Sequence, residues 1–188
     1  LKSKGVNRAT FFDTGAHDAT NGSYAAQVSA LGFDIENHTW EHQYPSAGNG
    51  NWSVPYLTNQ ISATERQNAR LTGRPQCFFR PPGGNMANVS VATRARGMTA
   101  VLWNVDSRDW AQPGYLSAAA TATIVQNATN LRYADPNHPV VLMHDAKASH
   151  EPDSQVSPFR GNSLAALPTI IDWYRSHGYR FVDMYGRS

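Results

Sequence analysis

The 188-residue sequence has little cysteine, little charge and no long apolar run. Its one cysteine, Cys77, excludes an internal disulfide, and the surrounding stretch 76–79 predicts a small buried side chain rather than redox chemistry or a cysteine-ligated metal. Charged residues make up 16% of the chain and the formal net charge is +2, without a basic block, which argues against nucleic acid as a partner. No apolar run approaches the roughly 18 residues that a membrane span needs.

The order of the predicted elements indicates an α/β fold in a single domain covering residues 1–188. Stretches of strand length alternate with stretches of helical spacing, which predicts parallel strands joined by right-handed crossovers. No glycine-rich dinucleotide fingerprint follows the first strand, so a (β/α) barrel is favoured over a doubly wound sheet. The predicted strands are residues 8–12, 33–37, 76–79, 99–105, 139–143 and 178–184, and the predicted helices are 19–31, 54–71, 89–96, 117–131 and 163–177.

Two histidines four residues apart, His38 and His42, directly follow the predicted strand 33–37. If the chain makes one helical turn after His38, both imidazoles face one point, and neutral imidazole is the commonest metal ligand in proteins. A catalytic metal would also need a third protein ligand, usually a carboxylate, and an open position for water. Taken alone, the pair equally fits a buried histidine with satisfied hydrogen bonds beside a solvated one.

Chemically versatile side chains follow three more of the predicted strands. Residues 80–84 (Arg-Pro-Pro-Gly-Gly) come after strand 76–79, residues 106–110 (Asp-Ser-Arg-Asp-Trp) after strand 99–105, and His144 after strand 139–143. In an α/β barrel the catalytic residues lie where strands run into the loops that follow them. We therefore expect all these residues, with the histidine pair, to share one rim of the barrel.

Together these residue types suggest metal-assisted hydrolysis of an acyl group. His144 could act as general acid, with Asp109 orienting its ring and raising its pKa. Arg80 is suited to clamping a carboxylate, and the stiff turn 81–84 to aiming a backbone N–H at an oxyanion. Flat apolar faces for a sugar ring are offered by Trp40, Trp52 and Trp110.

Each of these residues also has a plainer role open to it. Arg80 could be a surface residue in a rigid turn, Asp106 and Asp109 could cap the following segment, and Trp110 could pack against the core while bordering the site. The remaining histidines lie in loops or at a helix end, and we expect them to be solvated: His17, His138, His150 and His177.

Four motifs, in order and with matching spacing, resemble those of the polysaccharide deacetylases with the NodB homology domain, carbohydrate esterase family four. Residues 38–42 are similar to the H-[S/T]-x-x-H metal motif, residues 80–84 to R-x-P-x-G, residues 106–110 to D-x-x-D-W, and residues 142–144 to L-x-H. The resemblance covers nearly the whole chain. The fold that it implies is a distorted, incomplete (β/α) barrel of the NodB type.

The resemblance also implies a role for each motif residue. His38 and His42 would bind a divalent metal, most often zinc, and His144 would be the general acid tuned by Asp109. Arg80 would hold the catalytic aspartate. Gly83, where relatives often carry tyrosine, would offer its N–H to the oxyanion. The residues expected to bind substrate are Trp110, Leu142, Gly83, Pro82 and Asp106.

The sequence departs from the family at its first motif, T-F-D-D-G, which carries the general base and the third metal ligand. We expect this motif upstream of Leu1, on a first strand that the sequence lacks; residues 1–6 look like a helix end capped by Gly5, which fits an incomplete N-terminus. Three explanations are open. The segment is a separate chain or was left out, the protein is a degenerate relative that binds glycan without hydrolysing it, or Asp13 stands in as a ligand.

The sequence therefore predicts a metal-dependent polysaccharide deacetylase, a carbohydrate esterase and amidohydrolase of linear amides. We expect it to remove N-acetyl or O-acetyl groups, most of all from N-acetylglucosamine units of peptidoglycan or a chitin-type glycan. The alternative is a non-catalytic glycan-binding relative; a scaffold role explains the histidines least well. The expected partner is a polysaccharide, with no nucleic acid and no membrane span, and the expected location is secreted or cell-wall associated.

Overall fold

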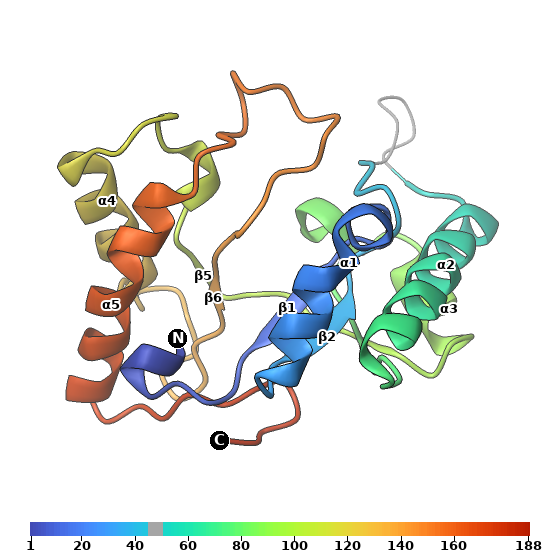
Figure 1. Ribbon diagram of the computed structural model, residues 1–188, viewed down its shortest axis with the longest axis horizontal. Coiled ribbons are helices and arrows are strands. Elements are labelled where there is room, and N and C mark those ends of the chain that lie inside the picture. Colours follow the sequence, from blue (N-terminus) through green and yellow to red (C-terminus); the bar gives the residue numbers. More distant parts are fainter. Residues whose placement is uncertain (45–50) are drawn as a thin grey trace. The chain divides into compact units, whose positions relative to one another are not determined.

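The computed structural model describes residues 1–44 and 51–188. The chain divides into two compact units (Figure 1). The four-strand unit consists of Val6–Leu102 and Phe181–Ser188, and the two-strand unit consists of Leu1–Gly5 and Trp103–Arg180. Part of the polar loop between the second histidine and Trp52, residues 45–50, lies outside the described residues.

The four-strand unit is built on a parallel sheet in the order β1-β2-β3-β4. Helices α1 and α2 pack against each other (Figure 1). The strands are β1 Thr10–Asp13, β2 Asp34–Asn37, β3 Phe78–Phe79 and β4 Thr99–Ala100. The helices are α1 Gly15–Ala30, α2 Val54–Thr72, the short 3₁₀ helix η2 Pro82–Gly84 and α3 Val89–Arg94.

Local sequence explains where the longest helix of this unit, α2, begins and ends. The Ser53 hydroxyl accepts a hydrogen bond from the Tyr56 N–H, Pro55 occupies the first turn, and Gly73 closes the helix at φ 68°. The buried face of α2 packs into an apolar core shared with β3 and α3. That core contains Trp52, Leu57, Ile61, Phe79, Val89, Ala92 and Met98.

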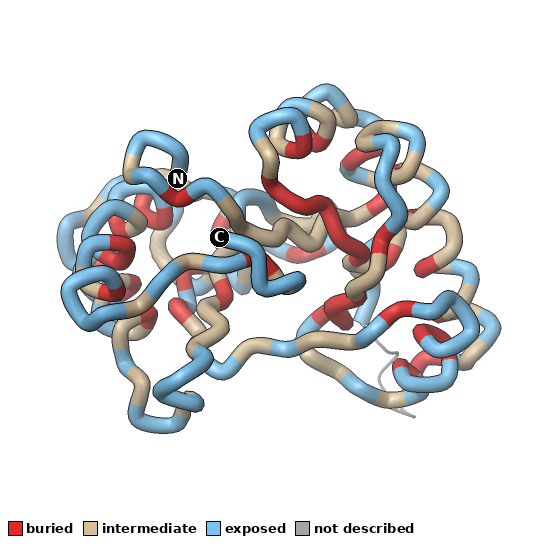
Figure 2. Tube along the Cα trace, turned by 90° about the horizontal axis from the view of Figure 1, so that it is seen from below, coloured by how far each residue is buried: buried red, intermediate tan, exposed pale blue. Residues whose placement is uncertain are grey.

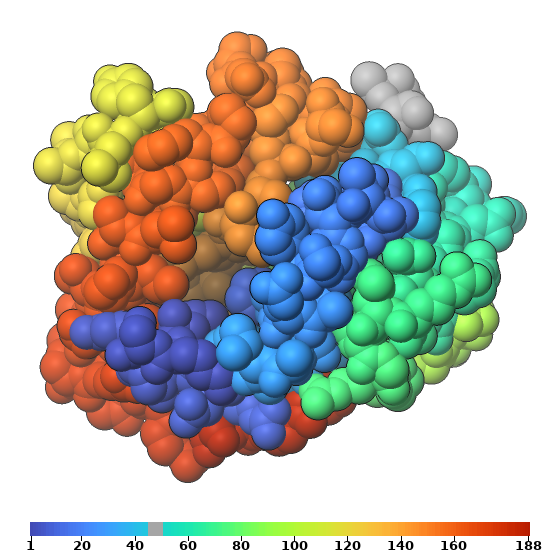
Figure 3. All heavy atoms as spheres, viewed as in Figure 1, coloured from blue at the N-terminus to red at the C-terminus, as the bar shows by residue number. Residues whose placement is uncertain are grey.

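The two-strand unit pairs β5 Val105–Asp106 with β6 Val141–Leu142, again in parallel. Helices α4 and α5 pack together, and the space-filling view shows their side chains in contact (yellow and orange-red in Figure 3). The Tyr174 hydroxyl joins them by donating to the Ala128 carbonyl at 2.7 Å. The helices are the 3₁₀ helices η1 Lys2–Lys4 and η3 Asp109–Ala111, with α4 Ala118–Ala128 and α5 Gly161–Ser176.

The parallel strands and connecting helices confirm the predicted α/β fold. Buried and exposed residues alternate along the helices, as amphipathic elements require (Figure 2). Gly5 caps η1 at φ 68°, as expected. Within the described residues no helix is long and apolar enough to cross a membrane.

Two predicted strands are wrong. Residues 99–105 divide into β4 and β5, which lie in different sheets, and the Asn104 side chain bonds the Val140 N–H and the His138 carbonyl. Residues 178–184 form no strand. Instead, the Asp183 carboxylate accepts the N–H groups of Tyr185 and Arg187, both at 2.9 Å, and so folds the chain into a turn.

Candidate functional site

The two motif histidines lie side by side directly after β2. The centroids of the His38 and His42 rings are 4.8 Å apart, with the rings inclined at 63°. His38 Nδ1 is 2.6 Å from the Arg80 carbonyl oxygen. Because a carbonyl only accepts, Nδ1 carries the proton, and Nε2 is the nitrogen that presents a lone pair. This is the tautomer that a metal-binding histidine adopts when its other nitrogen is held by a backbone carbonyl.

The rings approach each other without the helical turn that the spacing predicted. Thr39 and His42 have φ angles of 68° and 59°, so the segment is a bend with left-handed residues. Side chains take up its N–H groups: Gln60 Oε1 accepts those of Trp40 and Glu41, both at 3.0 Å, and Thr39 Oγ1 accepts that of His42 at 3.1 Å. These acceptors replace the backbone carbonyls that a helix would supply.

The pair fits a metal ion in part. Within residues 1–44 and 51–188, no group of three or more His, Cys, Asp or Glu side chains is placed to hold one. Asp13 pairs in register with Asn37, and partners in register share a face of the sheet while neighbours along a strand alternate. Asp13 therefore shares the face of Asn37, and it forms no group of three ligands with the two histidines. The described residues thus offer two imidazole ligands and no third ligand.

Arg80 is buried, which excludes the surface role that was open to it. Its guanidinium lies over the Phe12 ring, 4.1 Å from the centroid, and Nη2 donates to the Leu102 carbonyl at 3.2 Å. Burial lowers the pKa of Arg80 to about 10, which still leaves it charged at neutral pH. Its predicted role of holding an aspartate stays a prediction.

The turn after β3 has a neighbour that the sequence did not point to. Gly83 has φ 61°, a conformation that favours glycine, and a Cβ placed there would lie 2.9 Å from Tyr44 Cε1. The Tyr44 ring thus packs where a side chain at position 83 would be, and it contacts His42 edge to face at 5.4 Å. The signal in the sequence was Gly83 itself, in the stiff turn 81–84.

The second candidate group, in the two-strand unit, is His144 with Asp109. Asp109 is 1% exposed, and its Oδ1 lies 2.8 Å from His144 Nδ1. Its Oδ2 accepts the His144 backbone N–H at 2.9 Å and the Ser163 hydroxyl at 2.8 Å. Burial alone would raise the pKa of Asp109, but the hydrogen bonds and charge of His144 outweigh it and lower that pKa. Asp109 is thus an ionised acceptor in contact with the imidazole. Its predicted role of tuning a general acid stays a prediction, and the sequence did not point to Ser163.

The other predicted substrate residues have varied surroundings. Asp106 Oδ1 accepts the Arg108 N–H at 2.8 Å, which is the local capping role left open for it. Trp110 is half-buried, with the Arg108 guanidinium 5.7 Å from its ring centroid. Leu142 and Pro82 are buried.

Trp40 and Trp52 were also predicted to offer faces to a sugar ring, and for Trp52 this prediction is wrong. Trp52 is 4% exposed and belongs to the apolar core, so it offers no face to a sugar. Trp40 is half-buried against Gly15, where a Cβ would lie 2.3 Å from its ring.

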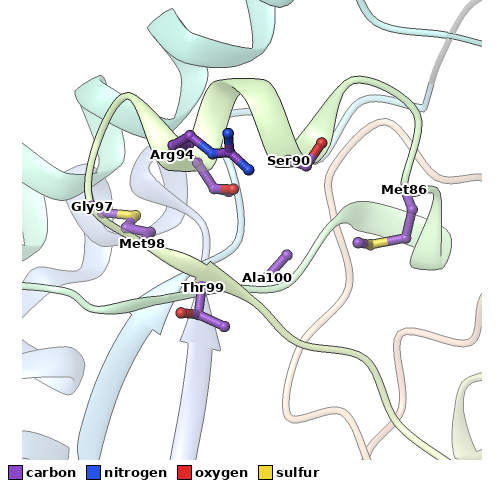
Figure 4. Close-up of a pocket in the computed structure, with 8 residues that line it drawn as sticks. Met86, Ser90, Arg94, Gly97, Met98, Thr99 and Ala100 are labelled. Carbon is purple, nitrogen blue, oxygen red and sulfur yellow. The ribbon is translucent and has the colours of Figure 1, made fainter.

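A hollow of about 350 Å³ beside α3 contains none of the motif residues (Figure 4). Its walls carry a single charged side chain, Arg94, and no pair of groups suited to acid–base chemistry. The lining residues are Met86, Ser90, Thr93, Arg94, Gly97, Met98, Thr99 and Ala100. It is therefore not the candidate site.

The chain is similar to known deacetylases. Residues 1–101 match the polysaccharide deacetylase family. Over 179 residues, which are 94% of this chain and 73% of the relative, the sequence is 33% identical to a peptidoglycan-N-acetylglucosamine deacetylase of Bacillus cereus (strain ATCC 14579).

Solved structures show the same fold. A peptidoglycan N-acetylglucosamine deacetylase in complex with 4-naphthalen-1-yl-N-oxidanyl-benzamide matches with a TM-score of 0.76 and 30% identity, over 98% of this chain and 76% of that one. A CE4 family pseudoenzyme from Bacillus anthracis matches with a TM-score of 0.78 and 24% identity, over 98% of this chain and 56% of that one. The chain thus spans little more than half of the pseudoenzyme and about three quarters of the two deacetylases. On the family match and the identity to the Bacillus cereus relative, this chain belongs to the polysaccharide deacetylase family.

Proposed function

We propose that the protein hydrolyses N-acetyl groups on a cell-wall polysaccharide, with a divalent metal as cofactor. The observation that carries the proposal is the His144–Asp109 pair, because a buried carboxylate on Nδ1 is the arrangement that holds an imidazole ready to give up a proton from Nε2. The pair also stands at the two motifs that the family resemblance assigns to the general acid. A secreted or cell-wall-associated location is part of the same proposal.

His38 and His42 would hold the metal, and zinc suits two neutral imidazoles. The hydrogen bond from His38 Nδ1 to the Arg80 carbonyl supports this, since it leaves Nε2 for the ion. When bound, such a metal acts as a Lewis acid and makes a water nucleophilic at neutral pH.

The chain's own residues would do the remaining work of the reaction. His144 would protonate the departing sugar amine. Asp109 would orient the His144 ring and stabilise the imidazolium that is present before the proton is given to the amine. Gly83 would donate its N–H to the oxyanion. The assignment of both histidine groups to one reaction rests on the order of the family's motifs, and each group is described within its own unit.

Peptidoglycan is the substrate that we favour, with N-acetylglucosamine as the sugar that carries the acetamide. The support is the name of the Bacillus cereus relative and that of the structure at 30% identity. A chitin-type glycan presents the same acetamide and is the next choice. An acetylated xylan, whose leaving group is a hydroxyl, is the least favoured.

A second function, glycan binding without hydrolysis, is favoured by one observation. No third metal ligand is found among the described residues, and a metal with two protein ligands is incomplete as a catalytic centre. Both functions predict binding to peptidoglycan, so binding alone does not separate them.

The test is acetate release from peptidoglycan, N-acetylchitooligosaccharides and acetylated xylan by the protein with added zinc. The expected result is release from the first two substrates, with peptidoglycan faster, and loss of release when zinc is removed by a chelator. Binding to insoluble peptidoglycan is measured in parallel by co-sedimentation. Binding without any acetate release would replace the enzyme with the glycan-binding function, and the absence of both would overturn the two proposals together.

A further inference from the structure

The Asp109 carboxylate receives three hydrogen bonds, and only two of them come from His144. The third is from the Ser163 hydroxyl, which donates to Oδ2 at 2.8 Å. Ser163 is 6% exposed, lies in the first turn of α5 and is 54 residues away in the sequence. With the His144 N–H and the Ser163 hydroxyl both on Oδ2, the carboxylate has one orientation that also puts Oδ1 on the imidazole.

We propose that Ser163 is a positioning residue for the candidate general acid, holding the Asp109 carboxylate so that Oδ1 stays on His144 Nδ1. The inference rests on the proposed function for its catalytic meaning, but its geometry stands on the structure alone. Ser163 touches Asp109 and acts through it on His144.

The first turn of α5 is anchored firmly enough for this task. The buried Asn162 side chain accepts the Ser117 N–H at 2.9 Å and donates to the Tyr115 carbonyl at 2.9 Å and the Pro113 carbonyl at 3.3 Å. Asn162 therefore fastens this turn to the segment that leads from η3 into α4. A serine on an anchored turn has its hydroxyl fixed in place, so it can hold a carboxylate with little loss of side-chain entropy.

Ser163 also weakens Asp109 as a base. A donor on the carboxylate disperses its negative charge, so the imidazolium beside it gains less stabilisation than it would from a carboxylate without that donor. Arg160 is a charged side chain that interacts with Asp109. Burial lowers the pKa of Arg160, and the negative charges of Asp109, Asp145 and Glu151 oppose that fall. Arg160 precedes α5 and donates from Nη2 to the Ala146 carbonyl at 2.9 Å. None of these charges is altered by a change at Ser163.

The experiment compares Ser163→Ala with Ser163→Thr, which keeps the hydroxyl, and with Ser176→Ala. Ser176 is the matched control because it lies on the same helix and bonds only within its last turn, to Trp173 and His177. The ring signals of His144, assigned by their loss in His144→Ala, are followed by NMR through a pH titration. In parallel, kcat and KM for acetate release are measured across pH.

In Ser163→Ala the midpoint of the His144 titration should fall, because a carboxylate that is no longer held on Nδ1 stabilises the imidazolium less. The value of kcat should fall roughly tenfold at unchanged KM, the rate equivalent of one hydrogen bond to a charged group. Ser163→Thr and Ser176→Ala should match the wild type. If Ser163→Ala does not fold, Ser163→Cys, whose thiol is a weak donor, takes its place with a smaller shift in the same direction.

An unchanged or raised midpoint in the folded Ser163→Ala or Ser163→Cys protein would overturn the inference, because a rise would mean that Ser163 only disperses the charge of Asp109. Failure of the proposed function has a different signature, because the titration needs no turnover. If the protein releases no acetate but the midpoint still shifts in Ser163→Ala, the inference that Ser163 positions Asp109 stands. Only the proposed enzymatic function is then withdrawn.

Discussion

Among single residues, His144 matters most to the proposed reaction. His144→Ala should keep bound metal but lose about 10²–10⁴-fold in kcat, because general acid catalysis contributes on that order. The matched control is His138→Ala: that imidazole also contacts a carboxylate, Asp135 at 3.0 Å, but its side chain is 84% exposed. Acetate release by the control should equal that of the wild type. A kcat for His144→Ala near that of His138→Ala would remove His144 from the mechanism.

Gly83 allows a second test of the site at this scale. Gly83→Ala places a side chain at φ 61°, and its Cβ would meet the Tyr44 ring at 2.9 Å. Gly97→Ala has nearly the same φ, 65°, but its Cβ meets nothing within 4 Å. Both variants should lose about 1 kcal/mol of unfolding free energy from the backbone conformation, measured by urea denaturation. Gly83→Ala should lose more, and the excess reports the Tyr44 contact; equal losses would contradict that contact.

The sequence predicted the motif residues of the site but not the residues that contact and orient them. His38, His42, Asp109 and His144 are recognisable because metal binding and proton transfer need those residue types at those spacings. Ser163, Tyr44 and Gln60 are common polar residues whose meaning comes only from tertiary contacts, over separations such as the 54 residues between Asp109 and Ser163. The predicted helical turn between the histidines was wrong for the same reason, since Gln60 on α2 supplies an acceptor for two N–H groups that a local pattern does not show.

Among the elements, the C-terminal segment 181–188 is held to β2 by hydrogen bonds and ion pairs of polar and charged side chains. The Tyr185 hydroxyl donates to Glu36 Oε1 at 2.7 Å, and Arg187 contacts Asp34 at 2.6 Å and Asp183 at 2.8 Å. Glu36 Oε2 accepts the N–H groups of Cys77 and Phe78 at 2.9 and 2.8 Å. One buried carboxylate therefore connects β2, the start of β3 and the C-terminal segment.

This connection predicts a pH dependence that Glu36→Gln removes. Burial raises the pKa of Glu36 above its ordinary 4.5, so the folded protein binds this proton more tightly than the unfolded chain. The stability that Glu36 contributes is fully present below pH 4.5 and is lost as pH rises through the raised value. Glutamine keeps an acceptor for the two N–H groups and has no charge to bury. The unfolding free energy of Glu36→Gln relative to wild type should therefore rise from pH 4.5 towards neutral; a difference independent of pH would contradict the assignment.

The two strands that were predicted wrongly show what a local pattern leaves out. Residues 178–184 have the apolar alternation of a strand, but a strand also needs a partner, and Asp183 takes the N–H groups that such a partner would have used. Residues 99–105 read as one strand because nothing in the sequence marks the change of sheet at Asn104. The helices were predicted more closely, since caps such as Ser53 and Gly73 are local signals.

At the scale of the whole molecule, the predicted α/β class with parallel strands is confirmed, and the chain's match to family structures extends over 98% of its residues. The prediction that all the motif residues share one rim stays a prediction, because His38 and His42 belong to one unit and Asp109 and His144 to the other. The single domain over residues 1–188 likewise stays a prediction. Motif order reports on a family's chemistry, whereas the geometry between units depends on contacts that no motif encodes.

The metal links the site to the stability of the molecule. An ion that binds the folded state alone stabilises it by about 2.7 kcal/mol at a free concentration of 100 Kd, which for a chain of this size raises Tm by roughly 5–10 °C. Zinc should give this increase in the wild type and in His17→Ala. His17 is the control because it lies in the first turn of α1 with 45% of its side chain exposed. His38→Ala and His42→Ala each remove one of two imidazole ligands, so neither should respond, and elemental analysis should find no zinc bound to them. An equal rise of Tm in either variant would mean that zinc binds elsewhere on the protein, and the assignment of the histidine pair as its ligands would have to be withdrawn.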